Sequence, residues 1–316
     1  PRVNLRDPAL RDTVALGAPT IIVMVCSFVT VSVMNAASYC FADDGPSIIT
    51  YARLWYALPY SLLAIPITTA LFTELTHLHE DGDHDGFVRA VTSGTSQIMF
   101  LLIPFALYLV VFAFPLVTLY HFGAFTMDNV AQIAAFLAGL AAALPLYGVS
   151  SYLQKVFSSL RKMGVFALAS VIASVVQVAL TMLAVFAFQQ GASVPIESIA
   201  WASVTFYLVA DMAAFVYLKR RFGHVGITSI VRACVLGTLL GGAGALAGFG
   251  MLQGLQFVFG ALSGSIPQAF LYVVAGGVVS LAVTFGLAVK LRLPEASFIM
   301  DIVGKATRRF GRKRAR

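Results

Sequence analysis

Arg53 is the residue of this sequence whose position most strongly suggests chemistry. It lies in an apolar run, residues 48–75, that is long enough to cross a bilayer. A guanidinium at membrane depth is costly, so such groups usually face a protein interior or a watery cavity. Because a guanidinium binds phosphate oxygens with two donors and stays charged, we expect Arg53 to bind an anion such as a diphosphate. The alternative is that Arg53 reaches the outer surface or pairs with Asp43 or Asp44.

Two further polar residues lie inside apolar runs. Asp211 could be protonated, could bind a coupling cation, or could pair with a neighbouring helix. Asn35 could supply an amide oxygen to a cation site. We therefore treat Asp211 and Asn35 as candidates for coupling to Na⁺ or protons.

The polar loop of residues 76–90 contains ligand-type side chains: His77, His79, Glu80, Asp81, Asp83, His84 and Asp85. They show no closed four-ligand pattern, which favours a solvated loop or a short amphipathic helix and predicts no metal site. The sequence also contains no Walker A, GxSxG or HExxH motif, so we predict a protein that is not an enzyme and has no cofactor.

The composition indicates an integral membrane protein, because 59% of the 316 residues are hydrophobic and only 11% are charged. We predict an all-α fold with eight transmembrane helices, at about residues 14–38, 48–72, 93–119, 131–157, 164–188, 196–218, 228–253 and 268–290. The three cysteines lie in or beside these runs without CxxC spacing, which favours helix packing over disulfides or a metal site. The chain starts without an initiator Met, and we expect it to be part of a longer protein.

The basic residues are distributed asymmetrically along this topology. If residues 1–13 are a cytoplasmic lead-in, 20 of the 21 Lys and Arg lie at cytoplasmic ends, with Arg53 the exception. The positive-inside rule then predicts that both termini are cytoplasmic. The tail from Lys305 to Arg316 is expected to contact the anionic inner leaflet, so the net charge of +7 indicates a membrane partner and no nucleic acid.

Prolines and glycines mark the helices expected to bend or to pack closely. Pro59 and Pro66 interrupt the second span, and Pro145 the fourth, which is typical of transporters whose kinked helices surround a cavity but also of statically bent bundles. The last two spans, in residues 227–292, are glycine-rich. They are expected to form a close helix hairpin, although a surface that holds a lipid chain is an alternative.

Several of these segments together resemble the MurJ/MviN family of lipid II flippases. The resemblance rests on the run ALPYSLLAIPITTALFTELT, on Tyr120, Gly123 and Phe125 in LYHFGAFT, and on LQKVF at residues 153–157. It covers about residues 14–190, and beyond these residues it rests on topology. In this sequence Ala52 stands where many members have Asp, and Arg53 is one residue from the family's position.

The resemblance implies a fold and a function. Residues 14–226 would be the second six-helix lobe of a transporter with the fold of multidrug exporters, residues 227–292 the final helix pair, and residues 293–316 a basic cytoplasmic tail. The missing N-terminal lobe would then be a partner within the same protein. The substrate would be lipid II or a related polyprenyl-diphosphate glycolipid, flipped across the bacterial cytoplasmic membrane with Arg53 on its diphosphate. The final pair would line a groove for the polyprenyl chain.

Alternatives within the same fold are an exporter of another polyprenyl-linked glycan or of drugs. A non-transporting membrane scaffold is an alternative from a different class.

Overall fold

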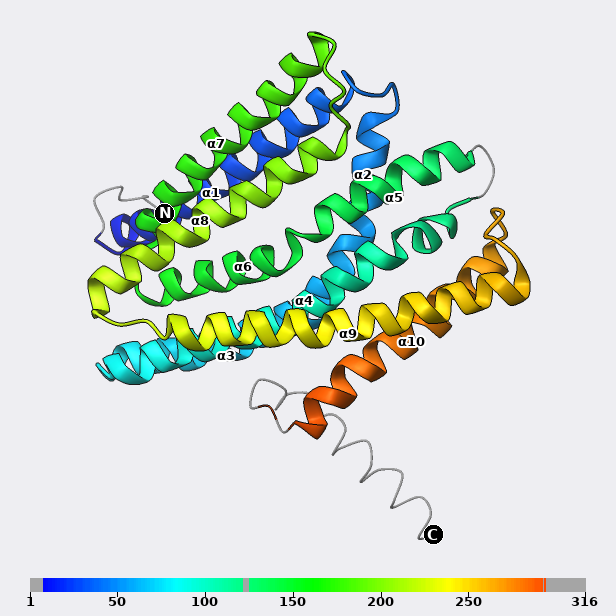
Figure 1. Ribbon diagram of the computed structural model, residues 1–316. Helices are drawn as coiled ribbons and strands as arrows, with labels where there is room; N and C mark the ends of the chain where they lie inside the picture. Colours follow the sequence, from blue (N-terminus) through cyan, green and yellow to red (C-terminus); the bar gives the residue numbers. More distant parts are fainter. Residues whose placement is uncertain (1–7, 122–124, 292, 294–316) are drawn as a thin grey trace, which may run out of the picture.

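A computed structural model describes residues 8–121, 125–291 and 293 of the chain, with side chains from residue 17 onward. These residues form helices and contain no strand (Figure 1). The elements are α1 (Pro8–Ser38), α2 (Gly45–Pro59), the π-helical turn η1 (Tyr60–Ala64), α3 (Ile65–Glu80), α4 (His84–Thr118), α5 (Met127–Ala141), α6 (Leu144–Ser159), α7 (Met163–Gln189), α8 (Glu197–Phe222), α9 (Ile227–Phe259) and α10 (Ile266–Lys290).

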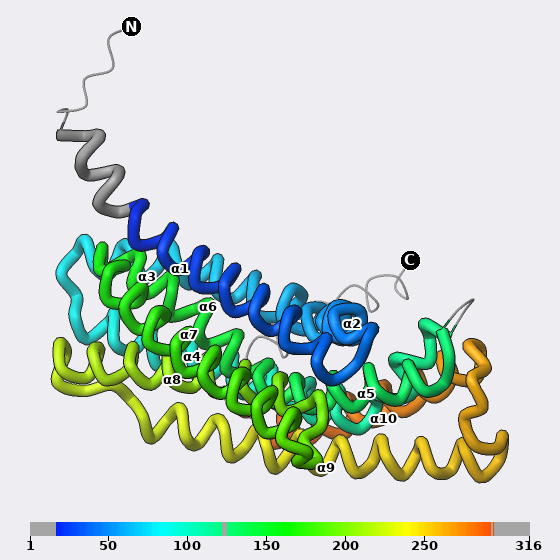
Figure 2. The backbone as a smooth tube through the Cα atoms, turned by 90° about the horizontal axis from the view of Figure 1, so that it is seen from above, coloured from blue at the N-terminus to red at the C-terminus, as the bar shows by residue number. Residues whose placement is uncertain are grey.

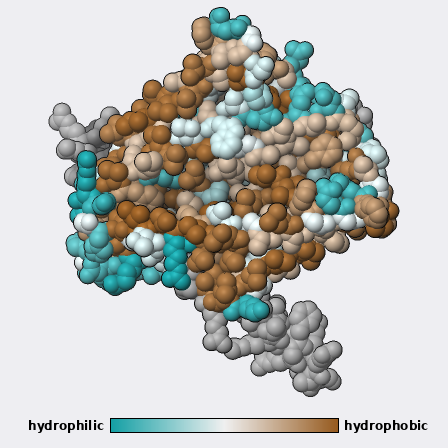
Figure 3. All heavy atoms as spheres, viewed as in Figure 1, coloured by the Kyte–Doolittle hydropathy of each residue, from teal (hydrophilic) through white to brown (hydrophobic). Residues whose placement is uncertain are grey.

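The described residues contain seven helical stretches that are long and apolar enough to cross a membrane, and the bent pair α5–α6 gives an eighth. The predicted all-α membrane fold is therefore confirmed. Apolar side chains cover the middle of the face seen in Figure 3, and hydrophilic side chains gather toward its edges. The helix ends differ from those predicted, because α2, η1 and α3 continue without a break from Gly45 to Glu80, and α9 extends to Phe259.

Helix α4 forms the centre of the bundle. In its apolar window 61% of the residues are buried, against 22–39% in the other unbent spans. It is covered by α3, α5, α6, α9 and α10, while α1 and α9 lie on opposite sides of the molecule (Figures 1 and 2). A helix that is apolar on every side has to be buried or to face lipid. Helix α4 is buried mainly by the neighbouring helices.

Helix α6 is fixed against α4 by one close approach and one hydrogen bond. A Cβ atom at Gly148 would overlap the side chains of Leu102 and Ile98 of α4, which would have to shift, so glycine favours this close approach of the helices. One turn further on, the buried Tyr152 hydroxyl donates to the Ala90 carbonyl at 2.9 Å. The opposite face of α6 is thereby directed away from α4, toward α1 and α8.

Pro59 is followed by a change in the hydrogen-bond pattern of the second span. Proline has no N–H to continue the α-helical ladder, and the next residues form the π turn η1, in which the Ile65 N–H donates to the Tyr60 carbonyl five residues back. The span stays continuous in spite of its two prolines. Pro66 lies directly after this turn, at the start of α3, and it also has no N–H to donate.

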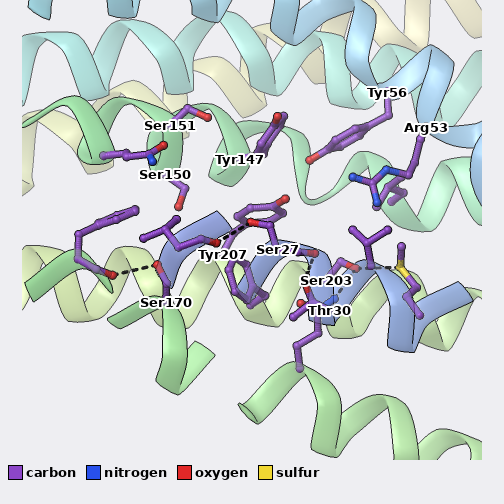
Figure 4. Close-up of a pocket in the computed structure, with 18 residues that line it drawn as sticks. Ser27, Thr30, Arg53, Tyr56, Tyr147, Ser150, Ser151, Ser170, Ser203 and Tyr207 are labelled. Atoms are coloured by element: carbon purple, nitrogen blue, oxygen red, sulfur yellow. Dashed lines mark hydrogen bonds between the residues drawn. The ribbon is translucent and has the colours of Figure 1, made fainter. Parts of the chain in front are cut away.

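Pro145 has a different effect in the fourth span. It lies in the first turn of α6, and the axes of α5 and α6 differ by 50° at the break. The expected kink is therefore present. It brings Tyr147, Ser150 and Ser151 to the cavity, where the Ser150 side chain points toward α1 and α8 (Figure 4) and Ser151 accepts a hydrogen bond from Tyr60 of η1.

The two glycine-rich helices form a close hairpin that is also packed on α4. Side chains at Gly244 and Gly248 of α9 would collide with residues of α10, whereas a side chain at Gly241 would meet Pro104 of α4. The expected helix packing is therefore observed, but α9 uses its glycines against two different neighbours.

The polar loop before α4 is short, since α3 ends at Glu80 and α4 begins at His84.

Candidate functional site

A cavity of about 220 Å³ lies inside the bundle, between the group α1, α7 and α8 and the group α2, α5 and α6. Figure 4 shows Arg53 and Tyr56 entering it from α2, opposite side chains from α1 and α8. Half of its lining residues carry a hydroxyl group, namely Ser27, Thr30, Tyr56, Tyr147, Ser150, Ser151, Ser170, Ser203 and Tyr207. The remaining polar lining residues are Arg53, Gln154 and Gln177.

Arg53 is the charged residue of this cavity, and no carboxylate lines it among the described residues. The side chain is half-buried and forms no ion pair within that part of the chain. Asp44, one of the two expected partners, instead accepts a hydrogen bond from the Asn129 amide at 2.7 Å. Because α2 begins at Gly45, Arg53 lies eight residues inside the helix, about 12 Å along its axis. The structure thus places Arg53 in an inter-helix cavity. It lies eight residues from the start of α2, whereas the predicted span of residues 48–72 places it five residues from the start.

Four tyrosines form a cluster beside Arg53. Tyr147 of α6 is at its centre, with ring centroids 5.7 Å from Tyr56, 4.2 Å from Tyr60 and 5.3 Å from Tyr207. Arg53, Tyr56, Tyr147 and Tyr207 line the same cavity, so the guanidinium and three of the four tyrosines face one space. The cluster therefore combines one fixed cation with neutral hydroxyl groups and aromatic faces.

The hydroxyl groups of the cavity differ in their availability to a ligand. Those of Ser27, Thr30 and Ser170 donate to carbonyls of their own helices. Tyr60, next to the cavity, donates to Ser151 at 3.0 Å. The buried Tyr56 hydroxyl has no partner among the described residues. A buried hydroxyl without a hydrogen bond is costly, so the Tyr56 hydroxyl is ready to donate to an acceptor that enters the cavity.

Asp211 lies on α8 one turn beyond Tyr207, outside the lining of this cavity. It is 4% exposed, and neither carboxylate oxygen has a hydrogen bond of good geometry among the described residues, although Ser150 of α6 is a polar neighbour. A buried charge without a partner is strongly disfavoured. The site therefore suits a protonated carboxyl, or a carboxylate that receives a cation.

Asn35 and Asp211 do not share a site. Met34, next to Asn35, contacts the Ser203 hydroxyl through its sulfur at 3.5 Å, which places this part of α1 level with Ser203. Asp211 is eight residues after Ser203 on α8, which corresponds to about 12 Å along the helix axis. The side-chain amide oxygen of Asn35 is buried without a partner among the described residues, so each group would have to act by itself.

Two further expectations concern the basic tail and metal or disulfide chemistry. The tail from Lys305 to Arg316 lies outside the described residues. Within those residues, no group of three or more His, Cys, Asp or Glu is close enough to hold a metal ion, and Cys26, Cys40 and Cys234 are free thiols.

Sequence reasoning identified Arg53 but missed the tyrosine cluster. The spacing of Arg53, Tyr56 and Tyr60 gave a local signal, since residues three and four apart share one face of a helix. Tyr147 and Tyr207 come from other helices and gave no comparable signal, because their approach depends on the bend before α6 and on the packing of α8.

Comparison with known proteins supports the arrangement of helices described above. A family model described as "Lipid II flippase MurJ" matches residues 1–266. A solved structure titled "Lipid II flippase MurJ, inward closed conformation" is similar, with 18% sequence identity and a TM-score of 0.57, and the similarity covers 90% of this chain. It covers 53% of the solved chain, so the present chain spans about half the length of that protein. At this identity the structural likeness shows the fold.

Proposed function

Because the match over residues 1–266 shows that this chain belongs to the lipid II flippase MurJ family, we propose that it is the second lobe and final helix pair of a transporter that moves lipid II across the bacterial cytoplasmic membrane. In this proposal α1 to α8 form the lobe, and α9 and α10 form the pair. Both termini of the chain, including the basic tail, are cytoplasmic. The first lobe of the same protein covers the side on which α1 is exposed.

The observation that carries this proposal is the position of Arg53 in a cavity with no lining carboxylate among the described residues. A diphosphate brings several acceptor oxygens and no donors, so it matches a guanidinium surrounded by hydroxyl groups. The unpartnered Tyr56 hydroxyl is placed to donate one of these hydrogen bonds. The same cavity would repel a cationic drug, which favours the glycolipid over drug export.

Alternating access supplies the movement. A transporter of this kind needs a site whose contacts with the substrate differ between two arrangements of its halves. Here the cavity is lined from α2, which is followed by a π turn, from α6, which is preceded by a 50° bend, and from α1, α7 and α8 opposite them. Relative movement of these two groups of helices would change the distance from Arg53 to the hydroxyl groups opposite it.

The energy source in this proposal is a gradient of protons or Na⁺ that acts through Asp211. The supporting observation is a buried carboxylate without a hydrogen bond of good geometry, one turn from Tyr207 of the cavity. Asn35 is a separate candidate near the outer end of α1.

The test is translocation of labelled lipid II by the full-length protein in vesicles. Charge-assisted hydrogen bonds contribute about 1.5–3 kcal/mol, so Arg53→Ala should slow translocation by about 10- to 100-fold, and Arg53→Lys should slow it less. Arg232→Ala is the matched control, because it removes an exposed guanidinium at the start of α9, away from the cavity. Equal rates for Arg53→Ala and Arg232→Ala would refute the role of Arg53. Translocation of a different polyprenyl-linked glycan in place of lipid II would reassign the substrate.

A further inference from the structure

A second cavity lies between the first turns of α4 and the start of α9, apart from the one that contains Arg53. Its volume is about 390 Å³. Its lining residues come from α4 and from the segment that joins α8 to α9, and they are Val88, Arg89, Thr92, Ser93, Ser96, Gln97, His224, Gly226 and Ser229. None of these residues lines the Arg53 cavity.

The α4 side of this cavity is a polar stripe on a helix that is otherwise among the most apolar in the chain. Its members are Arg89, Thr92, Ser93, Ser96 and Gln97, whose spacing of i, i+3, i+4, i+7 and i+8 places them on one helical face. Thr92 also joins the stripe to the segment before α9, because its hydroxyl accepts a hydrogen bond from the Gly226 N–H at 3.2 Å.

Ser96 shows that the stripe is not satisfied by the protein alone. The residue is 5% exposed, and its hydroxyl has no hydrogen-bond partner among the described residues. Its neighbours Thr92 and Thr95 both donate to carbonyls of their own helix at 2.8 Å. Ser96 lines the cavity instead, which leaves a buried hydroxyl available to a ligand.

The rim of the cavity carries charges of both signs. Arg89 lies 4.0 Å from the Asp83 carboxylate, and His224 lies 4.0 Å from the Asp85 carboxylate. All four side chains are largely exposed, with the Asp83 side chain the least exposed at 46%. Such long, solvated contacts are weak and are easily exchanged for contacts with a ligand.

We propose that this cavity binds the headgroup of a zwitterionic phospholipid with a primary ammonium group, as in phosphatidylethanolamine. The phosphate oxygens accept hydrogen bonds from Arg89 and from the serine hydroxyls, including that of Ser96. The ammonium group lies toward Asp85 at the rim. A headgroup with a net negative charge fits less well, because Asp83 and Asp85 repel it. Basic and polar pockets at the ends of transmembrane helices are typical sites for lipid headgroups.

Binding at this site has a structural consequence that does not depend on the proposed transport function. The lining residues belong to α4 and to the segment from His224 to Ser229 that leads into α9. A bound headgroup therefore connects the centre of the bundle to the start of the α9–α10 hairpin, and it should stabilise their contact.

The experiment is native mass spectrometry of the intact protein in detergent, with equimolar phosphatidylethanolamine and phosphatidylglycerol. We expect the wild-type protein to retain phosphatidylethanolamine preferentially and Arg89→Gln to lower its bound fraction at least fivefold. Arg232→Gln is the matched control, with the same loss of charge on the first turns of α9, and it should bind as the wild type does. Asp85→Asn should shift the preference toward phosphatidylglycerol.

Ser96→Ala separates lipid binding from a structural role. Without lipid, the variant should unfold at the wild-type temperature or higher, because it removes an unpartnered hydroxyl. Added phosphatidylethanolamine should then stabilise the variant less than it stabilises the wild type. The proposal is overturned if Arg89→Gln retains the lipid as the wild type does, if the wild type prefers phosphatidylglycerol, or if inorganic phosphate alone stabilises the protein as much as the lipid.

Discussion

The substitution Gly244→Ala should loosen the α9–α10 hairpin. A Cβ atom at this position would overlap the Thr284 hydroxyl and the Ser280 carbonyl of α10. The carbonyl belongs to the backbone and cannot rotate away. The Thr284 hydroxyl is itself held by the carbonyls of Ser280 and Leu240, at 2.9 and 3.3 Å. The two helices would therefore have to move apart.

The magnitude follows from this geometry. Overpacking of a well-packed interface costs about 1–3 kcal/mol, and interfaces between membrane helices depend on such close packing. Gly242→Ala is the matched control, since a Cβ atom there has no atom within 4 Å. Alanine favours the helix over glycine by up to about 1 kcal/mol, so the control should be neutral or stabilising. Because both variants gain the same helix propensity, they should differ only by the overpacking cost, about 1–3 kcal/mol in unfolding free energy.

The assay is thermal unfolding of both variants in the same detergent, followed by circular dichroism or by the reactivity of the buried Cys26. Gly244→Ala should unfold several degrees below the wild type, and Gly242→Ala at or above it. If the two variants unfold at the same temperature, then α9 and α10 are not in contact at Gly244, and the reasoning about the hairpin fails.

Three other substitutions test the bundle and the lobe. Tyr152→Phe should destabilise the protein by about 1 kcal/mol in thermal unfolding, because it removes the hydrogen bond from the buried Tyr152 hydroxyl to the Ala90 carbonyl; an unchanged unfolding temperature would contradict this bond. Asp211→Asn should be as thermostable as the wild type or more so, since the carboxylate lacks a hydrogen bond of good geometry in the described residues, and a drop of several degrees would reveal a partner. Asn129→Ala should cost about 1 kcal/mol, because Asn129 completes a capping box with Thr126; hydrogen exchange in the first turn of α5 would measure it, and unchanged exchange would argue against the cap.

The sequence was sufficient to predict the membrane spans, because apolar runs of helical length are a strong signal in a chain with few charges. The position of Arg53 was predictable for the same reason, since a lone cation in such a run needs a polar environment. Helix ends were less predictable. The turn of α2 before Ile48 contains Gly45, Pro46 and Ser47, which composition assigns to a loop. The last turns of α9 follow Gln253 and Gly254, a polar and a small residue that suggest the end of a span.

The contacts between helices could not be predicted to the same degree. The glycines of α9 predicted close packing, but the sequence does not say that Gly241 faces α4 while Gly244 faces α10. Asn35 and Asp211 appeared as one possible cation site because both are polar residues in apolar runs. Their separation in depth follows from how far along α1 and α8 each residue lies, and this requires the register between the two helices.

The π turn at Tyr60–Ala64 determines the direction in which Arg53 points. This turn accommodates one residue more than an α-helical turn, and one residue corresponds to about 100° of rotation around a helix axis. If one residue were removed from Tyr60–Ala64 while α3 kept its place, α2 would turn by about that angle, and the guanidinium would leave the cavity for the surrounding lipid. The orientation of Arg53, the one deeply placed cation among the described residues, thus depends on a single additional residue in the π turn that follows α2.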